Sequence, residues 1–322
     1  MVDSTSPASV SSTPIGDCTV SFSRKEAGRY IINVTASDDA RVEQLKQRAE
    51  EILQEMKVAS GELTIDDNGA GPFTFWARVE AAVRRAYPFP ILDPPPLSTG
   101  WGGRASNDVL AIKTIVNRDR IKAYVPPLAH YNQYPTTRER QRDNILYLSG
   151  NSPSQIAGSP EKNPDVVVLN LADFPTDYER DAARILVRNA LLQVDFRGAE
   201  RIVRINRSGE GFNDLDWIVP HNLHAVMIPR VEDAETVSTM QEAVKSVRKE
   251  RGVSQEIFLI PSFNSEKGCQ NVESILNVSA YIIAVALNEE LSAHLIEMVK
   301  SAAKAKNLPI IPAYIPASSQ AF

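Results

Sequence analysis

Cysteine is scarce in this sequence, since Cys18 and Cys269 are the only two among 322 residues. Two cysteines cannot form a disulfide framework, so we expect a protein of a reducing compartment. No apolar run approaches the ~20 residues that a membrane-spanning helix needs. The first residues are rich in Ser and Thr, but they lack an apolar core and contain no arginine before Arg24, which argues against a secretory or mitochondrial leader. We therefore predict a cytoplasmic protein without a membrane association.

An excess of basic residues is missing as well. The formal net charge is −5, with 35 Lys and Arg against 40 Asp and Glu. A protein that binds nucleic acid usually presents a basic surface, so we expect no nucleic-acid partner. The hydrophobic content of 43% supports a substantial core. The length fits one large domain or two ordinary ones.

The N-terminal part has the pattern of a small α+β domain. Residues 1–17 are small and polar and predict a disordered tail. Residues 18–90 contain alternating runs at 19–23 and 29–34, separated by a glycine, which predict a β-hairpin. The further elements expected in this domain are a helix from Ser37 to Met56 with an acidic N-cap, a strand at 62–65, a turn at 66–69 and a helix at 75–86.

A Pro- and Gly-rich linker is expected over residues 91–141. It contains more aromatic residues than a free tether needs, among them Tyr124 and Tyr134. We therefore expect these aromatic side chains to dock on one of the two domains.

Residues 142–322 alternate short apolar runs with amphipathic segments. Runs at 165–170, 201–205 and 225–229 each end in polar residues, and residues 177–194 have helical spacing between the first two. Such an order predicts a parallel sheet covered by helices, with ligands bound beyond the carboxyl ends of the strands.

The fold expected for this part is an incomplete TIM-barrel-like (β/α) domain, so the whole chain is α/β. Seven strands are expected from Ile145 onwards, and the segment is shorter than the roughly 250 residues of a full barrel. An open barrel has two unpaired edge strands. These edges imply a partner chain in a homo- or hetero-oligomer, a docked linker or an imperfect barrel.

The order of motifs in this part resembles the citrate lyase beta subunit of the HpcH/HpaI aldolase group. The motifs, in chain order, are Leu-x-Asp at 171–173, Glu-x-Asp-Ala-Ala-Arg at 179–184, Arg-Ile-Asn at 204–206, Asp-Leu at 214–215 and Pro-Arg-Val-Glu at 229–232. The resemblance implies cleavage of a carbon–carbon bond in a hydroxy-acid thioester, carried by CoA or by an acyl carrier, with Mg²⁺ as cofactor.

Residues 12–87 resemble the citrate lyase acyl carrier protein, the gamma subunit. The match is carried by Asp-Asn-Gly-Ala at 67–70 and by the helical segment 77–86. In that family a serine near the start carries a phosphopantetheine-type arm. The register set by Gly16 and Asp17 puts Ile15 at that serine, and isoleucine has no hydroxyl group for the phosphodiester. We therefore expect no prosthetic group.

The resemblance assigns roles to residues that follow the strands. Arg204 corresponds to the substrate-binding arginine, and Asp173 to the last acid of an acidic motif, and we expect both to be catalytic. Further substrate-binding positions fall on Asn206, Arg230 and Glu232. The metal-binding positions fall on Asn264 and Glu290, and Glu266, two residues after Asn264, is a candidate to take the place of the missing glutamate.

Several acids of the family pattern are replaced here. Asn170 and Ala172 stand at two acidic positions, and Asn264 stands where the family has a metal-binding glutamate. Two hypotheses follow. The chain is a citrate lyase-like carbon–carbon lyase, or it is a catalytically degenerate pseudoenzyme that binds a partner or a metabolite. The candidate residues also have structural explanations. Arg204 would then simply form an ion pair with Asp173 or Glu232, and the acidic residues at the strand ends would form a solvated rim of the barrel.

Overall fold

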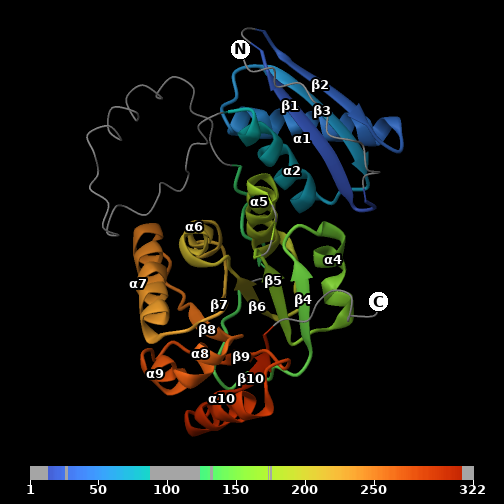
Figure 1. Ribbon diagram of the computed structural model, residues 1–322. Coiled ribbons are helices and arrows are strands. Elements are labelled where there is room, and N and C mark those ends of the chain that lie inside the picture. Colours follow the sequence, from blue (N-terminus) through green and yellow to red (C-terminus); the bar gives the residue numbers. More distant parts are fainter. Residues whose placement is uncertain are drawn as a thin grey trace, which may run out of the picture. The chain divides into compact units, whose positions relative to one another are not determined.

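The structure is a computed structural model that describes residues 14–25, 28–87, 124–130, 133–172, 174 and 176–313. The chain divides into two compact units, each with its own sheet (Figure 1). The first unit contains the described residues up to Tyr87, together with Tyr124, and the second begins at Val125. Residues 1–13 of the expected tail, most of the expected linker and Asp173 lie outside the described residues.

The first unit has a three-stranded sheet in the order β1-β3-β2. Strand β3 (Gly61–Asn68) pairs antiparallel with β1 (Asp17–Arg24) and parallel with β2 (Tyr30–Thr35). The predicted hairpin of the first two strands is therefore wrong. β3 lies at the centre of the sheet, and its two apolar side chains, Leu63 and Ile65, are fully buried. The predicted turn at 66–69 is wrong as well, because β3 continues to Asn68.

Both predicted helices of this unit are present. Helix α1 (Asp39–Glu55) begins after Asp38, whose carboxylate accepts a hydrogen bond from the backbone N–H of Arg41. Helix α2 (Pro72–Arg85) begins with a proline at its first position, where the missing N–H costs nothing.

The expected docking of Tyr124 is confirmed. Its ring centroid lies 5.7 Å from that of Trp76 on α2, and its hydroxyl accepts a hydrogen bond of 2.8 Å from Arg48 on α1. Tyr124 is 4% exposed, so it is part of the core of the first unit.

The second unit contains a sheet of seven parallel strands in the order β10-β9-β8-β7-β6-β5-β4. This curled half-barrel confirms the predicted incomplete TIM-barrel-like fold. The strands are β4 (Ile145–Ser149), β5 (Val166–Asn170), β6 (Glu200–Arg204), β7 (Ala225–Ile228), β8 (Phe258–Phe263), β9 (Val285–Leu287) and β10 (Ile310–Pro312).

Alternate residues of these strands fill the concave side of the sheet. The interior cluster includes Val166, Val168, Ile202, Met227, Ile260 and Ile311, all at most 1% exposed. Tyr147 of β4 belongs to the same cluster, and its hydroxyl donates to the carbonyl oxygen of Pro312 on β10. The two edge strands of the half-barrel are thus bridged by a side chain. Among the described residues no backbone ladder joins them.

Helices cover the outer side of this sheet (Figure 1). Helix α5 (Asp177–Gln193) begins with a capping box of Thr176 and Glu179. The remaining helices are α4 (Pro153–Gly158), the 3₁₀ turn η3 (Ser159–Lys162), α6 (Ser208–Ile218), α7 (Ala234–Arg251), α8 (Glu266–Gln270), α9 (Val272–Asn277) and α10 (Ala293–Ala305).

The segment 133–142 packs across the amino end of β6. Arg142 donates to both carboxylate oxygens of the buried Glu200, at 2.7 and 2.9 Å, and Thr136 donates to the same carboxylate. Tyr134 donates through its hydroxyl to the carbonyl of Ala199. A buried ion pair of this kind fixes the segment geometrically, because separating its partners leaves an uncompensated charge.

His224 lies in the same region and is fully buried. Its Nδ1 accepts from the backbone N–H of Arg201 at 3.0 Å, and its Nε2 lies 2.7 Å from the carbonyl oxygen of Tyr134. This pair of contacts requires a neutral ring with the proton on Nε2. Burial and the charge of Arg201 lower the pKa of His224 to about 3.

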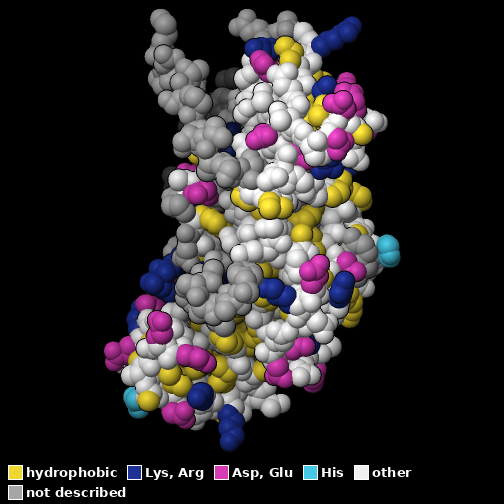
Figure 2. All heavy atoms as spheres, turned by 90° about the vertical axis from the view of Figure 1, so that its right-hand side faces the viewer, with side chains coloured by type: hydrophobic (Ala, Val, Ile, Leu, Met, Phe, Trp, Pro, Cys, Tyr) yellow, Lys and Arg dark blue, Asp and Glu magenta, His cyan; other side chains and the backbone are white. Residues whose placement is uncertain are grey.

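On the face drawn in Figure 2, acidic and basic side chains are interspersed rather than separated into patches. Within the described part of the chain, every helix is too short or too polar to cross a bilayer.

The neutral state of His224 predicts how stability depends on pH. Below pH 6.5 the unfolded chain takes up a proton at this histidine, whereas the folded chain does so only near pH 3, so stability falls as the pH falls. The slope contributed by one such group is about 1.4 kcal/mol per pH unit. Urea unfolding between pH 6.5 and 4 should show a shallower loss of stability for His224→Gln than for the unmodified chain. Equal slopes would contradict the neutral buried histidine, and His294→Gln on exposed α10 controls for removing a histidine.

Candidate functional site

The carboxyl ends of β5 and β6 bring Asn170 and Arg204 together. The two residues are opposite each other in the parallel register. Arg204 donates through Nη1 to Oδ1 of Asn170 at 2.9 Å, and the residues are 7% and 9% exposed, respectively. A guanidinium group is thus held at the end of the half-barrel where ligands bind in parallel α/β sheets.

The orientation of Asn170 is fixed by its own chain. Its Oδ1 accepts from the backbone N–H of Ala172 at 3.1 Å, and its Nδ2 donates to the carbonyl of Ala172 at 3.3 Å. The amide oxygen therefore faces Arg204. An amide carries no net charge, so this hydrogen bond orients the guanidinium group without cancelling its positive charge.

Tyr147 lies in the half-barrel near Arg204. Burial raises the pKa of the Tyr147 phenol, and the nearby Arg204 charge only partly opposes that rise. The phenol therefore stays protonated and donates to Pro312 at neutral pH. Nothing in the sequence pattern distinguishes this tyrosine from an ordinary core residue, and it was not predicted as part of the site.

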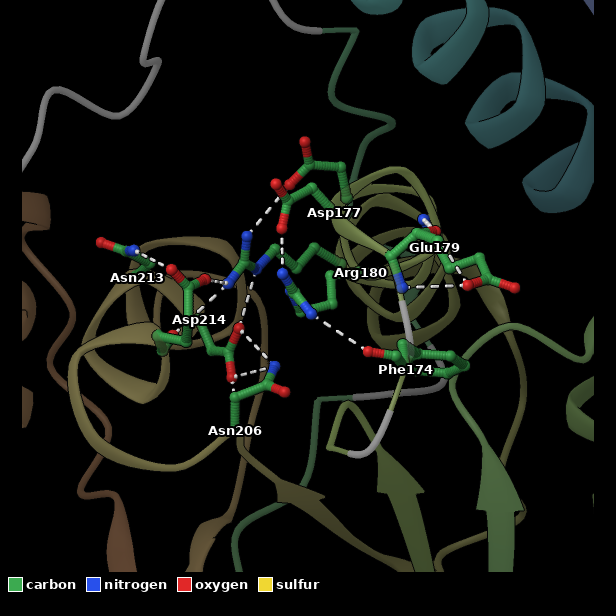
Figure 3. Close-up of polar contacts among 11 residues, drawn as sticks. Phe174, Asp177, Glu179, Arg180, Asn206, Asn213 and Asp214 are labelled. Atoms are coloured by element: carbon green, nitrogen blue, oxygen red, sulfur yellow. Dashed lines mark hydrogen bonds and ion pairs between the residues drawn. The ribbon is translucent and has the colours of Figure 1, made fainter.

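A second polar network joins α5, α6 and the loop after β6 (Figure 3). Asp214 of α6 is fully buried, and its Oδ1 accepts from Nε of Arg184 at 2.7 Å. Its Oδ2 accepts from the backbone N–H of Asn206 at 2.6 Å and from Nδ2 of Asn206 at 3.0 Å. Arg184 also pairs with Glu210 and Asp181, at 2.8 and 3.0 Å.

The carboxylates of this network stabilise the charged form of Arg184. Burial opposes the charged form of Arg184, but the carboxylates of Asp214, Glu210 and Asp181 outweigh burial and raise the pKa of the guanidinium group. Asp214 and Arg184 both belong to motifs of the family resemblance, but the sequence analysis assigned neither of them a function. Their contact depends on α6, a helix that the sequence pattern did not predict.

Glycine explains both why α6 was missed and why it packs so closely. Gly209 and Gly211 weaken the helical pattern near its start. A Cβ atom on Gly211 would lie 2.5 Å from the carbonyl oxygen of Asn206. Only glycine lets this helix approach the loop after β6.

Further polar contacts lie at the start of α5. Arg180 donates to the carbonyl of Phe174 at 3.0 Å and pairs with Asp177 (Figure 3). Both contacts are to residues that follow Asp173, the predicted catalytic acid, in the chain. Asp173 itself lies outside the described residues.

Two of the predicted substrate-binding residues follow β7 and are more exposed than Arg204. Arg230 is exposed and has a left-handed backbone with φ of 50°. Glu232 forms an ion pair with Lys267 at 3.3 Å, with both side chains well exposed. This pairing differs from the alternative in which Glu232 neutralises Arg204.

The predicted metal-binding residues follow β8 and β9. Oδ1 of Asn264 accepts from Ser262 at 2.7 Å, and the carboxylate of Glu266 accepts from Gln270 at 2.9 Å. Glu290 is exposed in the turn after β9. The turns are neighbours, because the N–H of Asn288 donates to the carbonyl of Phe263 at 3.0 Å.

These donors fit one kind of magnesium site. Mg²⁺ prefers hard oxygen ligands and commonly takes one or two carboxylates, with substrate and water completing its octahedron. The two turns offer carboxylate and amide oxygens of this type. Within the described residues, however, no group of three or more His, Cys, Asp or Glu side chains forms a protein-only metal site. Asn264, Glu266 and Glu290 thus offer one amide and two carboxylates, a set of oxygen ligands that matches the preference of Mg²⁺.

At the start of the first unit, Ile15 lies in the turn before β1 and is 83% exposed. Gly16 has φ of 82°, and its N–H donates to the carbonyl of Asn68 at 2.8 Å. Asp17 is held by Arg78 through two hydrogen bonds of 2.8 and 2.9 Å. The turn is thus well formed, and its exposed side chain has no group that can be acylated or phosphorylated.

The buried network makes a prediction about stability. Replacing Asp214 by Asn leaves the buried Arg184 without its central carboxylate, and breaking a buried pair costs roughly 3–5 kcal/mol. Urea unfolding should show a loss of this size for Asp214→Asn. Asp181→Asn removes an exposed partner of the same arginine and should cost below ~1 kcal/mol. Equal losses for the two variants would contradict the central role of Asp214.

Comparison with known proteins identifies both units. Residues 144–305 match the family described as HpcH/HpaI aldolase/citrate lyase, and residues 7–86 match the malonate decarboxylase delta subunit (MdcD). The predicted resemblance of the two parts is confirmed.

Curated relatives agree with the first match. Citrate lyase subunit beta of Leuconostoc mesenteroides subsp. cremoris is 29% identical over 155 residues, which are 47% of this chain and 51% of that protein. Mitochondrial citramalyl-CoA lyase of Homo sapiens is 24% identical over 177 residues, 54% of this chain and 50% of that protein. The chain thus spans about half the length of these relatives.

A solved structure of the citrate lyase beta subunit from M. tuberculosis, complexed with oxaloacetate and magnesium, is 18% identical to this chain. It covers 57% of this chain, with 82% of its own length matched, at a TM-score of 0.43. On the family match over half of its length, the chain belongs to the HpcH/HpaI aldolase/citrate lyase family, with an acyl-carrier-like domain fused at its N-terminal side.

Proposed function

We propose that this chain is a carbon–carbon lyase of the citrate lyase type that acts on a hydroxy-acid thioester of CoA or of an acyl carrier. The observation that carries the proposal is the buried Arg204, which is oriented by a neutral amide at the carboxyl end of the sheet. The names of the relatives, citrate lyase subunit beta and citramalyl-CoA lyase, support the reaction class. The few cysteines favour the cytoplasm as its location.

In this proposal Arg204 binds the carboxylate of the substrate. Hydrogen bonds between a guanidinium group and a carboxylate are strong and often bidentate. Asn170 holds one Nη1 hydrogen and thereby sets the direction in which the remaining donors point. Negative charge that develops as the carbon–carbon bond breaks is stabilised by the same fixed cation. Asp173, which follows β5, acts beside it.

The residues after β7, β8 and β9 complete the proposed site. Arg230 and Glu232 contact the more exposed part of the substrate. Asn264, Glu266 and Glu290 would hold Mg²⁺ together with substrate oxygens. When bound, Mg²⁺ supplies a Lewis acid that polarises the oxygens of the substrate.

A second candidate function is a binding subunit without catalysis. It is favoured by the neutral Asn264 and Ala172 at positions where the family resemblance implies acids, and by the open edge strands β4 and β10, which suit an oligomer. Such a subunit would bind the same acid through Arg204 and leave it intact.

Turnover distinguishes the two candidates. The purified chain with Mg²⁺ should cleave at least one of citryl-CoA, citramalyl-CoA and malyl-CoA. Chromatography of the products measures this cleavage. Arg204→Ala should lower kcat/KM by about 100-fold or more, because the charge-assisted contact to the carboxylate is lost.

Arg197→Ala is the matched control, since Arg197 is an exposed arginine near the amino end of the same strand. Absence of cleavage for all three thioesters, with Mg²⁺ binding unaffected by Glu290→Ala, would exclude the lyase and favour the binding subunit.

The acyl-carrier-like unit gives a separate prediction. Because Ile15 has no hydroxyl group, the chain purified from cells with an active phosphopantetheinyl-type transferase should have the mass of the unmodified polypeptide. Intact-mass spectrometry measures this directly, and Ile15→Ser is the variant that restores an attachment group. A mass increase of the unmodified sequence would contradict the assignment of Ile15.

A further inference from the structure

Strand β2 of the first unit has a backbone edge with which no described residue pairs. It pairs with β3 on its other side, over six residues in unbroken register, and it is the last strand of the sheet. Its sequence, Tyr-Ile-Ile-Asn-Val-Thr, contains no charged residue and no proline, whereas the other edge strand, β1, is bounded by Asp17 and Arg24. Natural proteins usually protect an edge strand from further pairing by a charge, a proline or a β-bulge. Strand β2 has none of these.

The side chains of β2 are incompletely covered on both faces of the sheet. Ile32 is opposite the buried Leu63 of β3 and faces the helices, so the alternation along the strand places Ile31 on the other face, where it is 49% exposed. On the helix side, a hollow of about 850 Å³ lies between β2 and α1, and Tyr30 and Ile32 form part of its wall. A further strand beside β2 would cover Ile31 on one face and the hollow on the other.

The edge suits a second copy of itself. Two identical strands that pair antiparallel across a two-fold axis place the residues near the axis beside their own copies. A charge at such a position would lie beside a like charge and destabilise the pair, and β2 has no charge. The rim of the hollow has equal numbers of basic and acidic residues, namely Arg29, Lys46, Glu43 and Glu50. It therefore does not repel its own copy as a rim of one sign would.

We propose that β2 is a dimerisation strand that pairs antiparallel with β2 of a second copy. Ile32 lies opposite Ile32 of the second copy, and Ile31 lies opposite Asn33. Tyr30 and Ile32 of each copy then lie over the hollow of the other, and the two three-stranded sheets form one continuous sheet. Because the contact consists of one short strand from each copy, we expect a Kd of about 1–100 μM, at the weak end of specific association.

Sedimentation equilibrium of the full chain, at concentrations of about 1–200 μM, tests the pairing. The unmodified chain should associate as its concentration rises. Ile31→Lys should weaken this association by about tenfold or more, because like charges then lie close to each other near the axis and the cover of Ile31 is lost. Ser21→Lys is the matched control and should keep the unmodified Kd, since Ser21 is exposed on the same face of the sheet but belongs to β1.

Charge complementation separates an interface from a defect in folding. Ile31→Glu alone should associate as weakly as Ile31→Lys. An equimolar mixture of the two variants should associate more tightly than either variant alone, because opposite charges then meet across the axis. Thermal unfolding of each variant reports whether it is folded. Should Ile31→Lys fail to fold, Asn33→Lys, at an exposed position on the same face of β2, should weaken the association in its place.

The second unit has open edge strands of its own, so the response to substitutions in β2 decides, rather than the size of the oligomer. Association that neither Ile31→Lys nor Asn33→Lys weakens would overturn the inference, as would a chain that stays monomeric over the whole concentration range. An equal loss of association for Ser21→Lys, or a mixture of the two Ile31 variants that associates no better than either alone, would overturn it as well.

Discussion

The hydrogen bond between Arg204 and Asn170 is the interaction on which the candidate site depends. A carboxylate in place of Asn170 would neutralise the guanidinium group, whereas the amide directs it and leaves its charge in place. The contact exists because β5 and β6 pair in parallel register, with both residues at their carboxyl ends. The almost wholly apolar interior of the half-barrel makes that register unambiguous. Packing of ordinary core residues therefore sets the geometry of a charged site.

A second set of polar contacts fixes the chain that follows β6. Asp214 binds the backbone and the side chain of Asn206 and is itself held by Arg184 from α5. Two helices and one strand end are thereby locked around a single buried carboxylate. The same architecture appears at the amino end of β6, where Arg142 and Glu200 fix the segment 133–142. Buried ion pairs thus lie at both ends of strand β6, Arg142 with Glu200 at the amino end and Arg184 with Asp214 beside the carboxyl end.

The parts of the fold predicted from sequence are those with a local signal. The apolar run of β5, the helical spacing of α5 and the acidic N-cap of α1 each identify an element without reference to the rest of the chain. The predicted hairpin failed because β3, which is distant in sequence, lies between β1 and β2, and strand order of this kind is a property of the whole sheet rather than of two neighbouring runs. Helix α6 was missed because Gly209 and Gly211 weaken its helical pattern, and Gly211 is needed for its close approach to the loop after β6. Of the predicted site, Arg204 and Asn206 lie in polar networks at the expected strand end, whereas the metal-binding positions stay predictions. The role of Asp214 depends on a long-range contact with Arg184 and Asn206 that no spacing rule contains.

The most direct test of substrate binding at Arg204 is a crystal structure of the chain with malyl-CoA bound. Binding in the proposed manner predicts the malyl carboxylate within hydrogen-bonding distance, about 2.7–2.9 Å, of the Arg204 guanidinium nitrogens at the carboxyl ends of β5 and β6. Asn170 should keep its hydrogen bond to Nη1 in that complex. A well-ordered malyl group bound elsewhere on the chain, with Arg204 making no contact to it, would contradict the assignment of this site.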